Sequence, residues 1–139
     1  MPLYDKPLAE LKTYKPPLTR EADFDAFWQK TLAEAATIPL QAQFTKTDYP
    51  SRLLTVYDVR YTGWNGARIA GWYVQPAGSG PFPGIVVYHG YSGSRAQPHS
   101  HFAWAAQGYA VLAVDTRGQS GESTDPTVYS TGHVKGWMT

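Results

Sequence analysis

Two turns in the sequence each follow an apolar run and carry residues that could take part in catalysis. The first is His89-Gly90-Tyr91, which follows the apolar residues 84–88. The second spans residues 115–119 and follows the apolar residues 109–114. A turn at the end of a buried strand can present a backbone N–H to the oxyanion that develops during acyl transfer. A strand, turn, helix and strand in this order suit a serine hydrolase.

Neither serine near these turns has the surroundings of a catalytic nucleophile. Residues 118–122 nearly spell the Gly-x-Ser-x-Gly elbow, but Glu122 occupies its last position. An elbow also needs a helix directly after the serine, and no helical pattern follows here. Ser92 fails in the same way. We therefore expect neither Ser120 nor Ser92 to be a nucleophile.

The composition excludes several classes of function. Twelve basic against eleven acidic residues leave a net charge of +1, which argues against nucleic acid or an anionic membrane as a partner. The sequence has no cysteine, which excludes disulfides, thiolate metal sites and a cysteine nucleophile. No signal peptide is visible, and no apolar run approaches the roughly 20 residues that span a bilayer. We expect a soluble, cytoplasmic protein.

The N-terminal part of the chain predicts two helices. Residues 7–14 favour a short helix that ends before Pro16-Pro17. A longer helix begins after Asp23, which can cap it, and ends before Pro39. Its apolar side chains recur at the spacing of one helical face, and they are Phe24, Phe27, Trp28, Leu32 and Ala35. Because an aromatic stripe of this size is costly to expose, we expect the helix to dock on another surface.

The middle of the chain predicts a hairpin. Alternation with a period of two begins at Leu53, and a return strand spans residues 68–75. Asn65-Gly66 marks the turn between them, because both residues tolerate positive φ. The two strands should be antiparallel.

A parallel unit should follow the hairpin. Residues 85–88 are apolar on both faces, as expected of a central strand with helices on each side. Residues 98–107 fit a helix that Gly108 ends, and residues 109–114 form a second apolar strand. Together these elements predict a right-handed βαβ unit with parallel strands.

Five motifs in this order resemble carbohydrate esterase family seven, which comprises the acetyl xylan esterases and cephalosporin-C deacetylases of the α/β-hydrolase superfamily. They are Asp23-Phe24-x-x-Phe27-Trp28, Asp48-Tyr49-Pro50, His89-Gly90-Tyr91, Arg117-Gly118-Gln119 and Gly136-Trp137-Met138-Thr139. The resemblance covers nearly the whole chain, from Leu3 to Thr139. It implies an α/β fold class, the N-terminal half of an α/β-hydrolase, in which N-terminal helices precede an antiparallel hairpin that leads into a parallel βαβ unit.

The resemblance also predicts how the chain is organised. Residues 1–139 would form one partial α/β-hydrolase domain. Within it, residues 1–50 are an N-terminal helical extension, residues 51–119 hold the first sheet strands and the crossover helix, and residues 120–139 are a surface excursion. In the family the nucleophile elbow, the acid and the general base lie beyond the Gly-Trp-Met-Thr motif. We therefore expect the C-terminal half to be absent and this chain alone to be inactive.

The family implies a carboxylic-ester hydrolase that deacetylates xylo-oligosaccharides and cephalosporin-type acetates by a Ser-His-Asp mechanism. No metal or cofactor is implied, and members assemble as hexamers. The expected partners are a small acetylated substrate, the missing C-terminal half and further copies of the chain, with no nucleic acid or membrane. A catalytically inactive truncated module for binding or oligomerisation remains an alternative. Another α/β-hydrolase branch is a third, against which Arg117-Gly118-Gln119 argues.

The resemblance assigns roles to single residues. It places one oxyanion-hole donor at Tyr91, through the backbone N–H and not the phenol. Gly90 would let the backbone approach the substrate closely. Arg117 has five donors in a rigid fork, which suits it to tying down carbonyls and carboxylates around the site more than to touching substrate. Gly118 and Gln119 are grouped with it as support or substrate-binding residues.

The aspartate of the second turn and the four histidines are expected to be structural. Asp115 should brace the Arg-Gly turn, and His89 should be hydrogen-bonded within its own turn. His99 and His101, two positions apart, would point to different sides of a helix and could not chelate together. No metal site is expected, and His133 has no physical role that we can derive.

Overall fold

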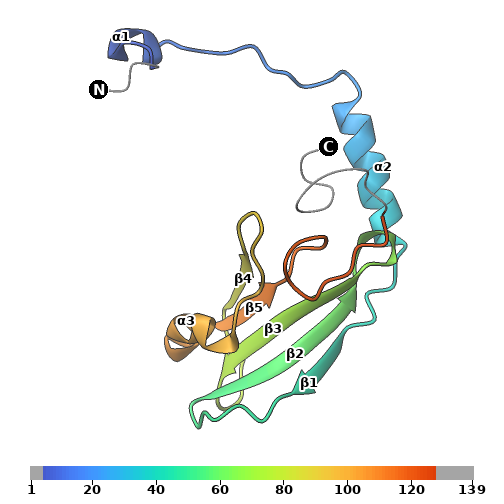
Figure 1. The fold of residues 1–139 in the computed structure, drawn as a ribbon, viewed down its shortest axis with the longest axis vertical. Helices are drawn as coiled ribbons and strands as arrows, with labels where there is room; N and C mark the ends of the chain where they lie inside the picture. The colour runs from blue at the N-terminus through green and yellow to red at the C-terminus, as the bar shows by residue number, and fades with distance from the viewer. Residues whose placement is uncertain (1–4, 128–139) are drawn as a thin grey trace. The chain divides into compact units, whose positions relative to one another are not determined.

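The computed structural model describes residues 5–127, so the motif at residues 136–139 and His133 lie outside the described residues. Contacts between residues divide the chain into two units, Met1–Leu32 and Ala33–Thr139. Figure 1 shows the elements of both units, coloured from blue at the N-terminus to red at the C-terminus. Each unit is described by itself.

Two helices occur where the sequence predicted them. Helix α1 (Leu8–Leu11) is a single turn, and helix α2 (Phe24–Ala36) begins directly after Asp23. The carbonyl of Asp23 accepts the N–H of Phe27 at 2.8 Å, which starts the helical ladder. The aromatic stripe packs on itself, with the Phe27 and Trp28 rings 5.6 Å apart in an edge-to-face contact. The surface on which this stripe would dock stays a prediction.

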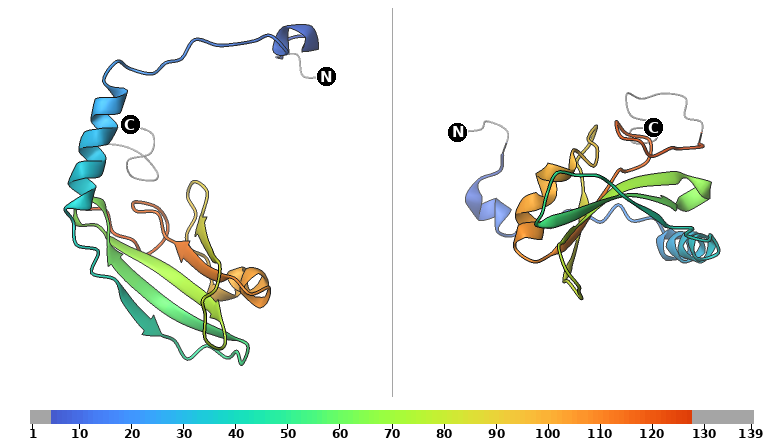
Figure 2. Two further views of the ribbon diagram at one scale, coloured as in Figure 1. Left: turned by 180° about the vertical axis from the view of Figure 1, so that it is seen from behind. Right: turned by 90° about the horizontal axis from the view of Figure 1, so that it is seen from below.

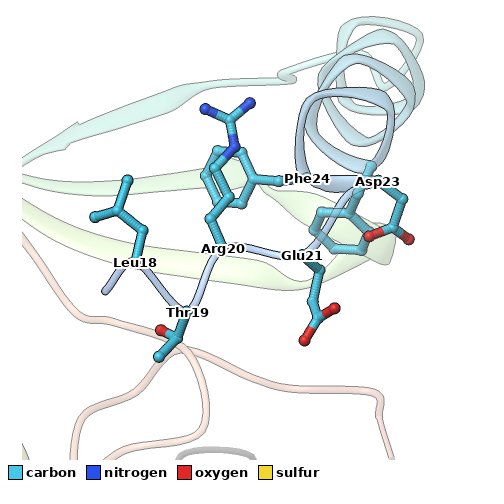
Figure 3. A pocket seen from close by; sticks show the side chains of 7 residues that line it. Leu18, Thr19, Arg20, Glu21, Asp23 and Phe24 are labelled. Carbon is cyan, nitrogen blue, oxygen red and sulfur yellow. The ribbon is translucent and has the colours of Figure 1, made fainter. Parts of the chain in front are cut away.

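An open hollow of about 520 Å³ lies beside the start of α2. Its lining consists of Leu18, Thr19, Arg20, Glu21, Asp23, Phe24 and Phe27. Figure 3 shows Arg20 beside Phe24, and the guanidinium carbon lies 4.7 Å from the centre of that ring. None of the predicted site residues lines this hollow, so the candidate site lies elsewhere.

The second unit is built on a five-stranded sheet with the order β1-β2-β3-β5-β4. Its strands are β1 (Gln43–Lys46), β2 (Leu54–Thr62), β3 (Arg68–Pro76), β4 (Gly84–Tyr88) and β5 (Ala110–Val114). The first three strands and β5 pair antiparallel, whereas β4 and β5 pair parallel (Figure 1). The expected antiparallel hairpin followed by a parallel pair is confirmed.

The hairpin turn has the backbone that its residues favour. Asn65 and Gly66 adopt φ values of 53° and 74°, the left-handed region that asparagine and glycine tolerate best. They lie in a short 3-10 turn, Trp64–Gly66. The N–H of Gly63 donates to the carbonyl of Ala67 at 2.8 Å and closes the loop. The loop is therefore longer than a two-residue hairpin turn.

The crossover helix differs in detail from the expectation. The predicted single helix over residues 98–107 is a 3-10 turn (Pro98–His101) followed by the short helix α3 (Phe102–Ala106). The break falls at His101, whose ring Nε2 lies 2.9 Å from the carbonyl of Arg95. This tertiary contact holds the first turn in place. Gly108 ends the helix at φ 97°, as predicted.

The strand β1 is an element that the sequence did not predict. It has four residues, of which Phe44 is the one large apolar side chain, and all four are exposed. A period of two cannot be recognised over so short a run. The strand forms because its backbone pairs with β2, where Phe44 lies opposite Val59.

Each face of the sheet carries its own core. On one face the buried side chains come from β2, β3 and α3, and they are Leu54, Val56, Val74 and Ala105. On the other face they come from the end of the hairpin and from β5, and they are Ala67, Ile69 and Val114. Figure 2 shows α3 beside the sheet, where it contacts β2, β3 and β5. The βαβ unit is thereby fixed to the hairpin.

Within the described residues, β4 is an edge strand. Val86 and Tyr88, which point to the same face, are 54% and 68% exposed. Exposed apolar edges of this kind pair with other chains and aggregate. Residues 1–139 expressed alone are therefore expected to be insoluble or poorly folded.

Val86→Lys should raise the soluble fraction of residues 1–139, because a charge on an exposed edge opposes edge-to-edge pairing. The measurement is the protein that remains in the supernatant after centrifugation, followed by size-exclusion chromatography. Val87→Lys is the control, since its register partner Ala113 is 1% exposed and lies on the packed face. A wild-type chain that stays soluble and melts cooperatively as a monomer would contradict this prediction.

Candidate active site

The two turns singled out in the sequence meet at one end of the sheet. Strands β4 and β5 are parallel neighbours in which Tyr88 lies opposite Val114, so the turns that follow them lie side by side. Three hydrogen bonds join the turns. They run from the Thr116 N–H to His89 Nε2 (2.9 Å), from the Ser92 N–H to Gln119 Oε1 (2.5 Å) and from Ser120 Oγ to the Ser92 carbonyl (2.9 Å).

His89 bridges the two turns in one tautomer. Its Nε2 accepts the Thr116 N–H and therefore carries no proton. The proton of the neutral ring must lie on Nδ1, which donates to the carbonyl of Gly90 at 2.8 Å. The expected hydrogen bond within its own turn is present. The second bond, to the neighbouring turn, was not foreseen.

The peptide between Gly90 and Tyr91 has a defined orientation. Its carbonyl accepts two hydrogen bonds, from His89 Nδ1 at 2.8 Å and from the Gly93 N–H at 3.0 Å. In a trans peptide the N–H and C=O point in opposite directions. The N–H of Tyr91 is therefore directed away from the groups that hold the Gly90 carbonyl. The Tyr91 side chain is 49% exposed.

Two features make this turn tight. Ser92 adopts φ 60°, a backbone region that residues other than glycine seldom enter. Gly93 packs so closely that an added Cβ would lie 2.9 Å from the Gly90 carbonyl oxygen and 2.9 Å from His89 Nδ1. Any side chain at position 93 would displace the two groups that orient the Gly90–Tyr91 peptide.

Arg95 lies in the loop after the first turn and was missed by the sequence analysis. The residue is 4% exposed, and its guanidinium carbon lies 3.9 Å from the centre of the Trp72 ring. Nη1 donates to the Gly71 carbonyl at 2.8 Å. Nη2 lies 2.7 Å from Glu122 Oε1 and 3.2 Å from Asp58 Oδ2. A lone arginine in a loop carries no sequence signal that distinguishes it from a solvated one.

Asp115 braces both turns, in keeping with its expected role. It is 1% exposed, and its Oδ1 accepts the backbone N–H of Arg95. Its Oδ2 accepts the Glu122 N–H at 2.8 Å, and its carbonyl accepts the Ser123 hydroxyl at 2.7 Å. Gly121 packs directly on the carboxylate, because an added Cβ would lie 2.2 Å from the Asp115 carboxyl carbon. Only glycine fits there.

The side chains of the Arg117-Gly118-Gln119 motif contact other loops of the protein. Arg117 Nη1 donates to the carbonyl of Trp64 at 3.5 Å, and its Nε lies 3.8 Å from Asp125 Oδ2. Gly118 turns the chain at φ 70°. The side chain of Gln119 accepts the Ser92 N–H and so belongs to the link between the turns. These contacts agree with the structural role that was favoured for Arg117 over a contact with substrate.

Charge is concentrated around Arg95, where Asp58, Arg60 and Glu122 form ion pairs. Burial alone would raise the pKa of Asp58, but Arg60 and Arg95 together outweigh it and hold that pKa below its usual value of 3.8. Hydrogen bonds from Arg60 at 2.5 Å and Arg95 at 2.7 Å likewise lower the pKa of Glu122 from its usual value of 4.5. The hydrogen bond with Asp58 in turn raises the pKa of Arg60. Both carboxyl groups therefore lose their protons at a lower pH than usual.

Two properties of residues 5–127 bear on a metal site and on a membrane. No group of three or more histidine, cysteine, aspartate or glutamate side chains in this range could hold a metal ion. The His101 ring is buried and faces the Arg95 carbonyl. Among the helices of the same range, none has the length and apolar character that a bilayer crossing requires.

Comparisons with known proteins agree on one family. The family model described as "Acetyl xylan esterase (AXE1)" matches residues 1–139. The solved structure of an acetyl xylan esterase from Paenibacillus sp. R4 is 46% identical, with a TM-score of 0.85, and the match covers 96% of this chain and 44% of that chain. Acetyl xylan esterase 1 from Thermoanaerobacterium sp. JW/SL YS485 is 30% identical, with a TM-score of 0.83, and the match covers 94% and 42%. The expected α/β-hydrolase fold class is confirmed. The chain spans less than half the length of these two relatives.

The charge cluster predicts a stability that depends on pH. A carboxyl with a lowered folded-state pKa contributes stability that is full above its unfolded pKa and is lost as the pH falls through the folded one. For Glu122 the loss therefore begins below about pH 4.5. Glu122→Gln should cost about 0.5–1 kcal/mol at pH 7, a small value because this side chain is 60% exposed.

The measurement is the free energy of unfolding from denaturant titrations at pH 7, 5 and 3, made on the folded protein that carries this chain. The cost of Glu122→Gln should shrink toward zero at pH 3. Glu21→Gln is the same change outside this cluster and serves as the control. A cost that stays equal at all three pH values would show that the Glu122 carboxylate contributes nothing through its charge.

Proposed function

Because the chain belongs to the acetyl xylan esterase (AXE1) family, we propose that the protein is a serine carboxylic-ester hydrolase that removes acetyl groups. One observation carries the proposal for this chain. The Gly90–Tyr91 peptide stands at the end of β4 with its carbonyl held by His89 and Gly93, so that its N–H is directed the opposite way. A peptide whose orientation is fixed in this way supports the proposal, because an oxyanion donor has to be preorganised.

In the proposed reaction a serine hydroxyl attacks the acetyl carbonyl carbon and a histidine takes its proton. Negative charge develops on the carbonyl oxygen, where the Tyr91 N–H would donate a hydrogen bond. The carbonyl re-forms as the alcohol leaves with the proton from histidine, and water then releases acetate from the acetyl-serine. The serine, histidine and acidic residue of the triad would come from a segment beyond the residues described. The residue after the serine would supply the second donor.

The substrates, the partners and the location of the protein are proposals as well. We propose acetylated xylo-oligosaccharides and cephalosporin-type acetates as substrates, without a cofactor. We further propose that the partners are a C-terminal segment and further copies of the chain in a hexamer, in the cytoplasm. The two relatives support the first substrate class, since both are named acetyl xylan esterases. The charge cluster and the two turns lie within one unit, Ala33–Thr139.

A chimera tests the proposed activity. Residues 1–139 are joined to the part of the Paenibacillus sp. R4 enzyme that the match does not cover, a graft that 46% identity makes reasonable. This assembled esterase should hydrolyse p-nitrophenyl acetate and acetylated xylo-oligosaccharides, whereas residues 1–139 alone should show only background. A folded chimera without activity would favour a catalytically inactive module for binding or oligomerisation. Hydrolysis by residues 1–139 alone, abolished by Ser120→Ala or Ser92→Ala, would place the nucleophile in this chain.

Substitutions at Tyr91 test the donor. Tyr91→Pro removes the backbone N–H and should lower kcat of the assembled esterase by about 100–1,000-fold, the usual loss for one oxyanion donor. Tyr91→Phe keeps the N–H and removes the phenol, so it should lose at most a few-fold of the activity. Both variants are compared for kcat, KM and melting temperature. An equal loss in both would assign the role to the phenol and contradict the backbone donor.

A further inference from the structure

We propose that His89 is a positioning residue for the oxyanion donor, a role that rests on the proposed function. Its Nδ1–H would hold the Gly90 carbonyl and thereby fix the plane of the peptide that carries the Tyr91 N–H. The ring would not touch substrate. It would act only through the peptide that follows it.

The first argument is the shared peptide. The carbonyl that His89 binds, at 2.8 Å, belongs to the same planar unit as the N–H of Tyr91. A rotation that weakens the bond to His89 also turns this N–H. The second bond to the carbonyl, from the Gly93 N–H, belongs to the same turn and moves with it. His89 is therefore the side chain that constrains the Gly90 carbonyl.

The second argument is the anchored ring. The Nε2 of His89 accepts the Thr116 N–H at 2.9 Å, which ties the ring to the turn after β5. This bond also places the ring proton on Nδ1, the only nitrogen that can donate to Gly90. The neighbouring strand thus sets both the position and the tautomer of the side chain. The Thr116 N–H in the turn after β5 thus acts on the turn after β4 through the His89 ring.

The third argument is polarisation. A peptide whose carbonyl accepts a hydrogen bond becomes a stronger donor at its N–H, because bonds in a chain polarise one another. The order Thr116 N–H, imidazole, Gly90 carbonyl and Tyr91 N–H forms such a chain. It would end at the position where the negative charge of the oxyanion develops.

The competing role is a simple link between the turns. In that case the bond from Thr116 would matter, and the bond to Gly90 would be incidental. The two roles use different ring nitrogens, so two substitutions separate them. Asparagine places its amide nitrogen about where Nδ1 lies, and glutamine places its amide oxygen about where Nε2 lies.

The experiment compares His89→Asn, His89→Gln and His89→Leu in the assembled esterase, with kcat, KM and melting temperature as readouts. Positioning predicts that His89→Gln and His89→Leu lower kcat by about 10–100-fold with little change in KM, since only the transition state carries the charge. His89→Asn should recover most of the loss in kcat. His99→Asn and His99→Gln are the matched controls, because His99 is exposed in the 3-10 turn after this loop. Their kcat should equal that of the wild type.

Each outcome has one meaning. Recovery by His89→Asn and not by His89→Gln supports the positioning role, whatever the melting temperatures. Recovery by His89→Gln and not by His89→Asn, or equal kcat in all three variants, overturns it while the proposed esterase function stands. A wild-type assembled esterase that hydrolyses no acetyl ester overturns the proposed function and the role of His89 with it.

Discussion

The loop that follows the turn after β4 depends on a buried cation, Arg95. Its guanidinium lies against the Trp72 ring and bonds to a strand carbonyl and to two carboxylates, while its backbone N–H is bound by Asp115. A charge taken out of water at such a position is tolerated only if it is paired and hydrogen-bonded throughout. That requirement ties this loop to β2, β3 and the segment after β5 at the same time.

The parallel pairing of β4 and β5 brings the candidate site residues close together. Because β4 and β5 run in the same direction, residues far apart in the sequence meet where the strands end. His89 then contacts Thr116, and Ser92 contacts both Gln119 and Ser120. The second turn therefore supports the first, and Gln119 of the Arg117-Gly118-Gln119 motif takes part in this link. Glycines at positions 93 and 121 permit the close packing that these contacts need.

Much of the architecture could be predicted from local patterns. Strong signals of spacing or backbone preference mark the helix after Asp23 and the Asn65-Gly66 turn. The apolar strands β4 and β5 carry signals of the same kind. The short strand β1 carried none, because pairing with β2 and not its own pattern creates it. The 3-10 start of the crossover helix was equally invisible, since it depends on a contact between His101 and the Arg95 carbonyl.

The sequence by itself determined the family, the order of most elements and the two turns with their candidate residues, since these rest on motifs and periodicity that are local in the chain. Only the tertiary structure decided what holds those turns. The position of Arg95 and the tautomer of His89 follow from contacts between residues 20 or more positions apart. The direction of the Gly90–Tyr91 peptide follows from a hydrogen bond whose partner the fold selects. Hydrogen bonds depend on distance and direction in space, and spacing along a chain does not specify either one.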